Sequence, residues 1–123
     1  MKVLYDSQIF VEQRYGGISR YFCEIANRAS NKNDVTIKIC APTNSNSYLE
    51  QISSKIKFEP NFSKVKNYHA RRTLNIISEE YYNAIFSPDI IHETYYSKNC
   101  RGKAKSLRVL TVYDMIHERL PGF

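Results

Sequence analysis

The sequence predicts an α/β fold in which an open, mainly parallel sheet is flanked by helices. Two observations support this. Short branched-aliphatic runs alternate along the chain with two stretches of helical periodicity, and the order strand, helix, strand, strand, helix, strand, strand requires crossovers that make neighbouring strands parallel. With 123 residues, the chain also has the length of one domain. These features together predict a single Rossmann-like domain over residues 1–123.

The first half of the chain holds the clearest signals. Residues 2–6 are a short apolar run ending in Asp6, which is typical of an opening strand. Residues 7–16 are expected to form a polar connection to a helix over 18–29. The apolar residues of that helix recur at helical spacing: Ile18, Tyr21, Phe22, Ile25, Ala26 and Ala29. In residues 35–39 apolar and polar side chains alternate, which predicts a second strand with one exposed face, away from the centre of the sheet.

The second half continues the same pattern. A loop is expected over 42–47, and a short strand over 56–58 that a following proline stops. A longer helix is expected over 68–86. Its predicted apolar face consists of Leu74, Ile77, Tyr81, Ala84 and Ile85. The runs 89–93 and 107–112 are rich in branched aliphatic residues and are expected to be strands covered on both faces.

Composition limits the class of protein. The formal charge of +6 favours an anionic partner, although a solvated basic surface has the same composition. A nucleic-acid binder has only this charge and the ten tyrosines in its favour, and is not expected. The three cysteines are widely spaced and odd in number, which predicts free thiols rather than disulfides or a zinc site. Without a signal peptide or a long apolar stretch, the chain is expected to be cytoplasmic.

Ligands of open parallel sheets bind outside the carboxyl ends of the strands. Gly16 and Gly17 stand there, directly before the first long helix, where bare backbone amides and the helix dipole attract an anion such as a phosphate. A plain tight turn explains the two glycines equally well. Arg20 is a candidate phosphate partner, and a solvent-facing arginine is the alternative.

Further polar residues follow the strands at the same edge. Asp6 is expected either to accept hydrogen bonds from sugar hydroxyls or to cap the loop amides that follow it. Glu93, Tyr95 and Tyr113 are candidate sugar-binding residues, because tyrosine rings often line sugar sites. His92, within an apolar strand, is interpreted as a core histidine rather than a catalytic one.

Asp114 and His117 are the candidate catalytic residues. They stand three residues apart in the loop after the last strand, at the expected ligand edge. Glu93 and Asp114 have the residue types of an acid/base pair, but the sequence does not give the distance between their carboxyl groups.

Four motifs together resemble a known family. They are Asp-x-Gln-x-Phe at 6–10, Gln-x-x-Gly-Gly-Ile-Ser-Arg-Tyr-Phe at 13–22, Pro-Asp-Ile-Ile-His at 88–92 and Thr-Val-Tyr-Asp-Met-Ile-His-Glu at 111–118. In this order and at these spacings they resemble the N-terminal domain of family 4 glycosyltransferases, which have the GT-B fold. The resemblance extends over nearly all of the chain.

The resemblance implies an enzyme that transfers a sugar from a nucleotide-sugar to a glycan or lipid-linked acceptor, with retention of configuration and without an essential metal or other cofactor. Gly16 and Gly17 are then expected near the donor phosphates, and residues 113–117 near the reacting sugar. Relatives in this family often carry His-Asp after the last strand, where this chain has Tyr113-Asp114 followed by His117.

The family's second domain, which binds the donor, has no counterpart in these residues. The chain is therefore expected to be a truncated N-terminal, acceptor-side domain, inactive alone, with an uncovered face that favours self-association. A peripheral position at the inner membrane face is expected from the basic balance. The alternative is a non-catalytic module that binds a phosphorylated ligand or a glycan.

Overall fold

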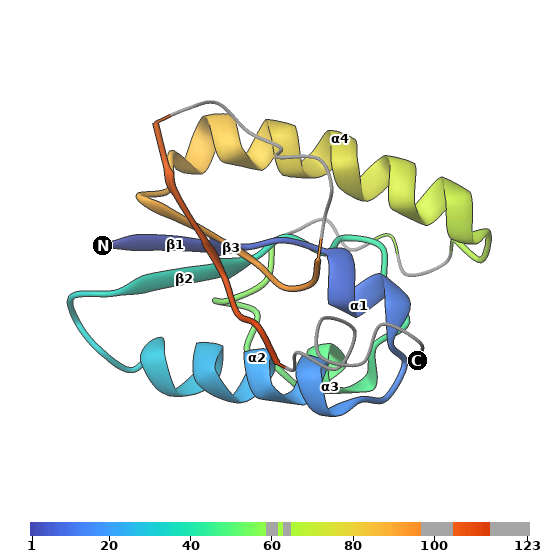
Figure 1. Cartoon of the computed structure of the whole chain (residues 1–123), viewed down its shortest axis with the longest axis horizontal. Helices are drawn as coiled ribbons and strands as arrows, with labels where there is room; N and C mark the ends of the chain where they lie inside the picture. Colours follow the sequence, from blue (N-terminus) through green and yellow to red (C-terminus); the bar gives the residue numbers. More distant parts are fainter. Residues whose placement is uncertain (59–61, 63–64, 97–104, 114–123) are drawn as a thin grey trace, which may run out of the picture.

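A computed structural model of the chain shows three layers, a sheet with helices on both faces (Figure 1). The structure describes residues 1–58, 62, 65–96 and 105–113. The described elements, in order, are β1 (Lys2–Tyr5), α1 (Gln8–Glu12), α2 (Gly17–Ala29), β2 (Thr36–Ile39), α3 (Ser47–Glu50), α4 (Tyr68–Phe86), β3 (Ile90–Glu93) and β4 (Leu107–Leu110).

The sheet has the order β2-β1-β3-β4, and all of its strand pairs are parallel. This confirms the predicted α/β, Rossmann-like fold. The strand expected at 35–39 is β2, which lies at an edge of the sheet. After β1 the chain first moves to β2 on one side and then returns to β3 on the other. The strand order therefore reverses between β1 and β3, where proteins with such sheets bind ligands.

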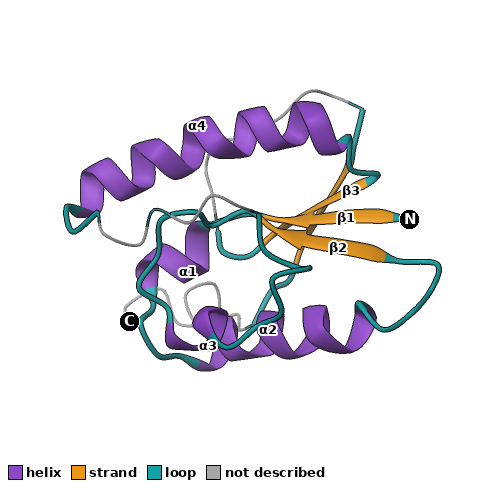
Figure 2. Ribbon diagram, turned by 180° about the vertical axis from the view of Figure 1, so that it is seen from behind, coloured by secondary structure: helices purple, strands orange, loops and turns teal. Residues whose placement is uncertain are grey.

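Each face of the sheet is covered by one long helix (Figure 2). Alternate side chains of a strand point to opposite faces, so β1 contributes to two clusters. Val3 and Tyr5 pack with Phe22 and Ala26 of α2 in the larger cluster. Leu4 packs on the other face in a smaller cluster, with Cys40, Tyr82, Phe58 and Phe86. The sheet is thereby fixed between α2 and α4.

Two short helices were not predicted from the sequence. Residues 7–16 contain α1, which forms because Ile9 and Phe10 are fully buried beneath its polar neighbours. The loop predicted over 42–47 ends at α3, whose first turn is capped by Asn46. The strand predicted at 56–58 is reduced to a single bridge between Lys57 and Ile39. The aromatic ring of Phe58 instead stacks on Tyr82 of α4, with ring centroids 3.9 Å apart.

Helix α4 has the predicted bounds but buries a different face. Its buried residues are Asn75, Glu79 and Tyr82, whereas the predicted apolar face is exposed. The reason is a pair of contacts with loops. Glu79 accepts a hydrogen bond from the amide of Ser7, at 2.8 Å. The side-chain oxygen of Asn75 accepts hydrogen bonds from the amide and the hydroxyl of Thr43, each at 2.9 Å. The side-chain amide of Asn75 donates a hydrogen bond to the backbone carbonyl of Thr43 at 2.7 Å. Buried polar groups need such partners, so the helix turns its polar side chains inward.

The prediction that the last strand is covered on both faces is wrong. Strand β4 lies at an edge of the sheet, and Leu107 and Leu110 are exposed. Cys23 and Cys40 are buried free thiols whose pKa is raised by burial, and Cys100 lies outside the described residues. In the described part of the chain, no helix combines the length and the apolar run needed to span a bilayer.

Candidate functional site

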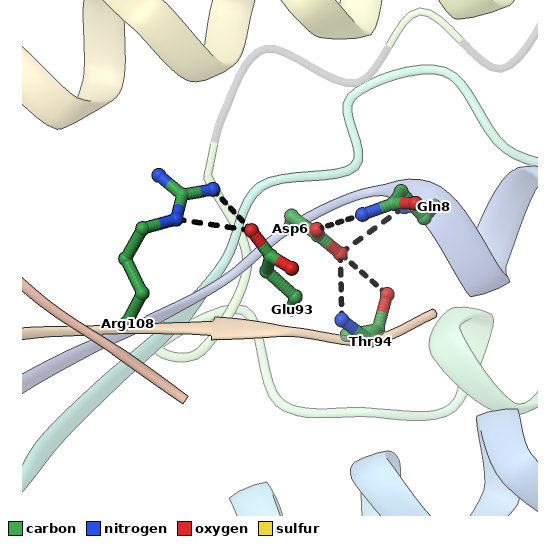
Figure 3. Close-up of polar contacts among 5 residues, drawn as sticks. All are labelled: Asp6, Gln8, Glu93, Thr94 and Arg108. Carbon is green, nitrogen blue, oxygen red and sulfur yellow. Dashed lines mark hydrogen bonds and ion pairs between the residues drawn. The ribbon is translucent and has the colours of Figure 1, made fainter. Parts of the chain in front are cut away.

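The candidate site lies at the carboxyl edge of the sheet, between β1 and β3. Asp6 directly follows β1, and its carboxylate oxygen Oδ1 accepts hydrogen bonds from the amide of Thr94 at 3.0 Å, from the Thr94 hydroxyl and from the amide of Gln8 at 3.3 Å (Figure 3). Its other oxygen accepts a bond from the Gln8 side chain. Burial raises the pKa of Asp6, and these hydrogen bonds oppose the rise. Asp6 therefore caps the loops after β1 and β3, which is one of its two predicted roles.

Glu93, at the end of β3, is bonded within the sheet. Its Oε1 accepts a hydrogen bond from Nε of Arg108 at 3.0 Å and a second from Nη2 (Figure 3). The Glu93 side chain is 11% exposed and that of Arg108 is 27% exposed, so the pair is largely withdrawn from water. The predicted sugar-binding carboxylate is thus occupied by a partner from β4.

The two glycines before α2 have different surroundings. A Cβ atom on Gly16 would lie 2.0 Å from Oε1 of Gln13, the same oxygen that accepts a hydrogen bond from the amide of Ser19 at 3.3 Å. Gly16 therefore leaves room for a side chain that caps the helix. A Cβ on Gly17 would have no heavy atom within 4 Å, so the space beside Gly17 is open.

The first turn of α2 carries backbone donors, beside that space, that have no acceptor within the described ranges. The first backbone hydrogen bond of the helix runs from the amide of Arg20 to the carbonyl of Gly16, at 3.1 Å. Among the described residues, the amides of Gly17 and Ile18 have no acceptor. Unpaired amides and the positive end of the helix dipole favour an anion at this position. Arg20 is exposed one turn along and lines the same surface depression as Gly17.

Tyr113, after β4, lies over the second turn of α2. Its ring contacts Tyr21 and Phe22 edge-on, with centroids 6.1 and 6.4 Å apart. Its amide donates a hydrogen bond to the Tyr96 hydroxyl, at 3.2 Å. The Tyr113 hydroxyl is buried and has no partner in the described part of the chain, and burial raises its pKa. The glycines and Tyr113 thus lie at the same edge of the sheet.

A pocket of about 260 Å³ lies at this edge, on the side of α4. Tyr95 and Tyr96 form one wall, with ring centroids 5.3 Å apart and planes tilted by 52°. Glu12 of α1 and Arg72 of α4 also line it. The pocket therefore combines aromatic faces with one carboxylate and one guanidinium, which are groups that bind polar ligands such as sugars.

His92 is half-buried and packs against core side chains, which agrees with its interpretation as a structural rather than a catalytic histidine. Its Nε2 lies 2.9 Å from the hydroxyl of Thr111, and its ring meets Tyr5 and Phe22 edge-on at 5.3 and 5.1 Å. Burial lowers the pKa of His92, which favours the neutral ring. The candidate catalytic residues Asp114 and His117 lie outside the described residues. Within the described ranges, no three His, Cys, Asp or Glu side chains are grouped as metal ligands.

Sequence reasoning missed the residues that organise this edge. Gln13, Thr94 and Arg108 each hold a predicted site residue or its loop in place. Gln13 belongs to the motif at 13–22, but the sequence did not indicate that its side chain binds an amide in the first turn of α2. Thr94 is among the polar residues expected at the carboxyl edge, but its bond to Asp6 and the bond of Arg108 to Glu93 could not be predicted, because each joins segments that are distant in the sequence.

Comparisons of the chain with protein-family models, with curated proteins and with solved structures find no significant match. The fold and the edge geometry define the chain as an α/β protein with a Rossmann-like parallel sheet.

Proposed function

We propose that this domain is the acceptor-side part of a retaining glycosyltransferase, which transfers a sugar from a nucleotide-sugar to a glycan or lipid-linked acceptor. The observation that carries the proposal is the open N-terminus of α2. The space beside Gly17 is free, the amides of Gly17 and Ile18 have no acceptor among the described residues, and the ring of Tyr113 packs edge-on against Tyr21 in the second turn of the same helix. The resemblance of four motifs to family 4 glycosyltransferases supports the same assignment.

In this proposal the diphosphate of the donor lies at the start of α2. Two free amides donate to phosphate oxygens, and the guanidinium of Arg20 adds a charged donor from the next turn. The Tyr113 hydroxyl donates to an oxygen of the donor and thereby gains the partner that it lacks among the described residues. Such fixed donors stabilise the charge that develops on the departing nucleoside diphosphate.

The acceptor lies in the pocket beside Tyr95. Tyrosine rings pack against the apolar faces of sugars, whereas Glu12 accepts a hydrogen bond from the Tyr68 hydroxyl and Arg72 interacts with the same hydroxyl. In this proposal Asp6 and Glu93 have a structural role and do not contact the acceptor. Their carboxylates already bind Thr94 and Arg108, so they hold the loops in position rather than contact the sugar.

Asp114 and His117 border the reacting sugar in this proposal, on the resemblance alone. A second domain completes the cleft and supplies most of the donor contacts. Catalysis then depends on holding donor and acceptor together and on electrostatic stabilisation of an oxocarbenium-like transition state.

The test is a transfer assay on the complete protein that carries this domain, with a panel of nucleotide-sugars and glycan acceptors. We expect Gly17→Val to abolish transfer without unfolding the domain, because the added side chain fills open space that the phosphates need. Arg20→Ala should lower turnover, and Lys32→Ala, an exposed cation beyond the C-terminal end of the same helix, should not. Unchanged turnover in Gly17→Val would contradict the proposed phosphate site.

The same assay separates the alternative function. A binding module for a phosphorylated ligand or glycan would bind at Gly17 without releasing nucleoside diphosphate from any donor. Saturable binding in the complete protein with no turnover across the panel would favour that module.

A further inference from the structure

The side chain of Gln8 is held by Asp6 in one orientation. Its Nε2 donates a hydrogen bond to Oδ2 of Asp6, as Figure 3 shows. An ionised carboxylate only accepts hydrogen bonds, so the amide nitrogen of Gln8, and not its oxygen, faces Asp6. The carboxylate is fixed in turn by the amide and the hydroxyl of Thr94. The carbonyl oxygen Oε1 of Gln8 is therefore directed away from Asp6.

Oε1 of Gln8 is an accessible acceptor. It receives no hydrogen bond from the described residues, and Gln8 is half-buried at the start of α1. Within the described ranges, the buried side-chain polar atom that lacks a partner is the Tyr113 hydroxyl, so Oε1 of Gln8 is in contact with solvent. A group that the fold already orients loses little freedom when a ligand binds to it.

Gln8 lines the pocket of about 260 Å³ whose wall is formed by Tyr95 and Tyr96. This volume is just below the range of about 300–1,000 Å³ of sites that enclose drug-sized ligands, so it suits a single sugar ring. The aromatic wall suits the apolar face of such a ring. An acceptor oxygen suits a hydroxyl group at its edge.

Other polar side chains of the pocket are bonded to neighbouring elements. The Ser7 hydroxyl donates to Glu79, and Glu12 accepts a hydrogen bond from the Tyr68 hydroxyl. Gln8 is therefore the half-buried residue of this lining whose acceptor oxygen is bonded to nothing else in the described part of the chain.

We propose that Gln8 determines which sugar the pocket accepts, with Oε1 accepting a hydrogen bond from one hydroxyl group of that sugar. Asp6 is a positioning residue, because it fixes the side-chain amide of Gln8 and does not contact the ligand. A sugar without this hydroxyl leaves the acceptor oxygen unpaired and binds more weakly. This role of Gln8 rests on the proposed function, from which the acceptor sugar is taken, and adds the residue that recognises it.

A titration with simple glycosides tests this role without a nucleotide. The probes are the methyl pyranosides of glucose, galactose and mannose, added singly to the isotope-labelled chain. At least one of them should bind saturably and shift the side-chain amide resonances of Gln8 and the backbone amide resonance of Tyr95. Among the monodeoxy derivatives of that glycoside, one should bind about tenfold more weakly.

Two variants separate recognition of the sugar from support of Asp6. Gln8→Lys keeps a donor for Asp6 but has no acceptor, whereas Gln8→Met has neither. Both should bind the glycoside about tenfold more weakly than the unchanged chain. The weakly bound deoxy derivative should bind equally to the unchanged chain and to Gln8→Lys, because the contact is then absent from both.

The matched control is Gln51→Lys, which makes the same exchange at an exposed position after α3. It should bind the glycoside like the unchanged chain. Circular dichroism checks that all variants remain folded.

Three results would overturn the proposal. They are an absence of saturable binding with all three glycosides, binding that leaves the Gln8 resonances unmoved, and unchanged affinity in Gln8→Lys. The last result would show that Gln8 serves only the bond to Asp6. Binding of the glycoside at Gln8, without nucleotide binding at Gly17, would contradict the proposed sugar transfer and support the role of Gln8. Failure of one proposal is thus distinguishable from failure of the other.

Discussion

Glu79 of α4 and Ser7, the residue after Asp6, are joined by two hydrogen bonds. The amide of Ser7 donates to Oε1 of Glu79 at 2.8 Å, and the Ser7 hydroxyl donates to the same oxygen. This contact ties the long helix to the loop that follows β1. Because Asp6 caps the neighbouring amides, the carboxyl edge of the sheet is held from two sides.

Replacing Glu79 should weaken the fold. Glu79→Leu leaves the buried amide and hydroxyl of Ser7 without an acceptor, and we expect the free energy of unfolding to fall by about 2 kcal/mol. Glu80→Leu, at the adjacent exposed position, should change it by less than about 0.5 kcal/mol. Urea unfolding of both variants measures the difference. Equal losses in the two variants would show that the contact with Ser7 contributes nothing of its own.

The ion pair between Glu93 and Arg108 should contribute more to the free energy of unfolding than an exposed ion pair does. Arg108→Ala leaves a largely buried carboxylate unpaired, with an expected loss of about 2 kcal/mol after allowance for its partial exposure. Arg28→Ala removes the partner of Glu24 in a pair whose side chains are 85% and 56% exposed, and should cost less than about 0.5 kcal/mol. Thermal or urea unfolding compares them, and a larger loss in Arg28→Ala would contradict the assignment.

Asp6 makes the free energy of unfolding of the domain depend on pH. Burial raises the pKa of Asp6 in the folded state, so the folded chain holds this proton more tightly than the unfolded chain. The stabilising contribution is full below the unfolded pKa of about 3.9 and is lost as the pH rises through the folded pKa. Asp6→Asn should remove this pH-dependent contribution to the free energy of unfolding, because the amide does not titrate.

The measurement is urea unfolding from acidic to neutral pH for both proteins. The stability of Asp6→Asn, relative to the unchanged chain, should increase as the pH rises. A constant difference between them would mean that Asp6 does not titrate in this range.

Tyr113→Phe should affect ligand binding without lowering the stability of the fold. The Tyr113 hydroxyl is buried without a partner among the described residues, so its removal should leave the free energy of unfolding unchanged or raise it by up to about 1 kcal/mol. The same variant should bind a nucleotide-sugar more weakly. A marked loss of stability would show instead that the hydroxyl serves the fold.

The sequence was sufficient to predict the helices and strands whose apolar pattern is clear. Apolar periodicity placed the helices at 17–29 and 68–86 within a residue, and the short aliphatic runs placed the four strands. Helices α1 and α3 have five and four residues, which is too short for periodicity to be recognised. Their presence depends on the burial of Ile9, Phe10 and Leu49.

Apolar periodicity did not predict which face of α4 is buried, and the reason is different. Asn75 and Glu79 are buried because they bind Thr43 and Ser7, which are 32 and 72 residues away in the sequence. A periodicity argument weighs only hydrophobicity, so it selected the opposite face. The place of the site, at the carboxyl edge, follows from parallel strand order alone. Which carboxylates are already bonded there depends on contacts between strands, as Asp6 and Glu93 illustrate.

The central claim is that the start of α2 receives the diphosphate of a nucleotide-sugar. The most direct measurement is a titration of the isotope-labelled chain with nucleoside diphosphates, followed through its amide resonances. The account predicts saturable shifts at Gly17 and Ile18 that vanish in Gly17→Val, while the resonances of α4 stay in place. Unmoved Gly17 and Ile18 resonances, or equal shifts in Gly17→Val, would contradict it.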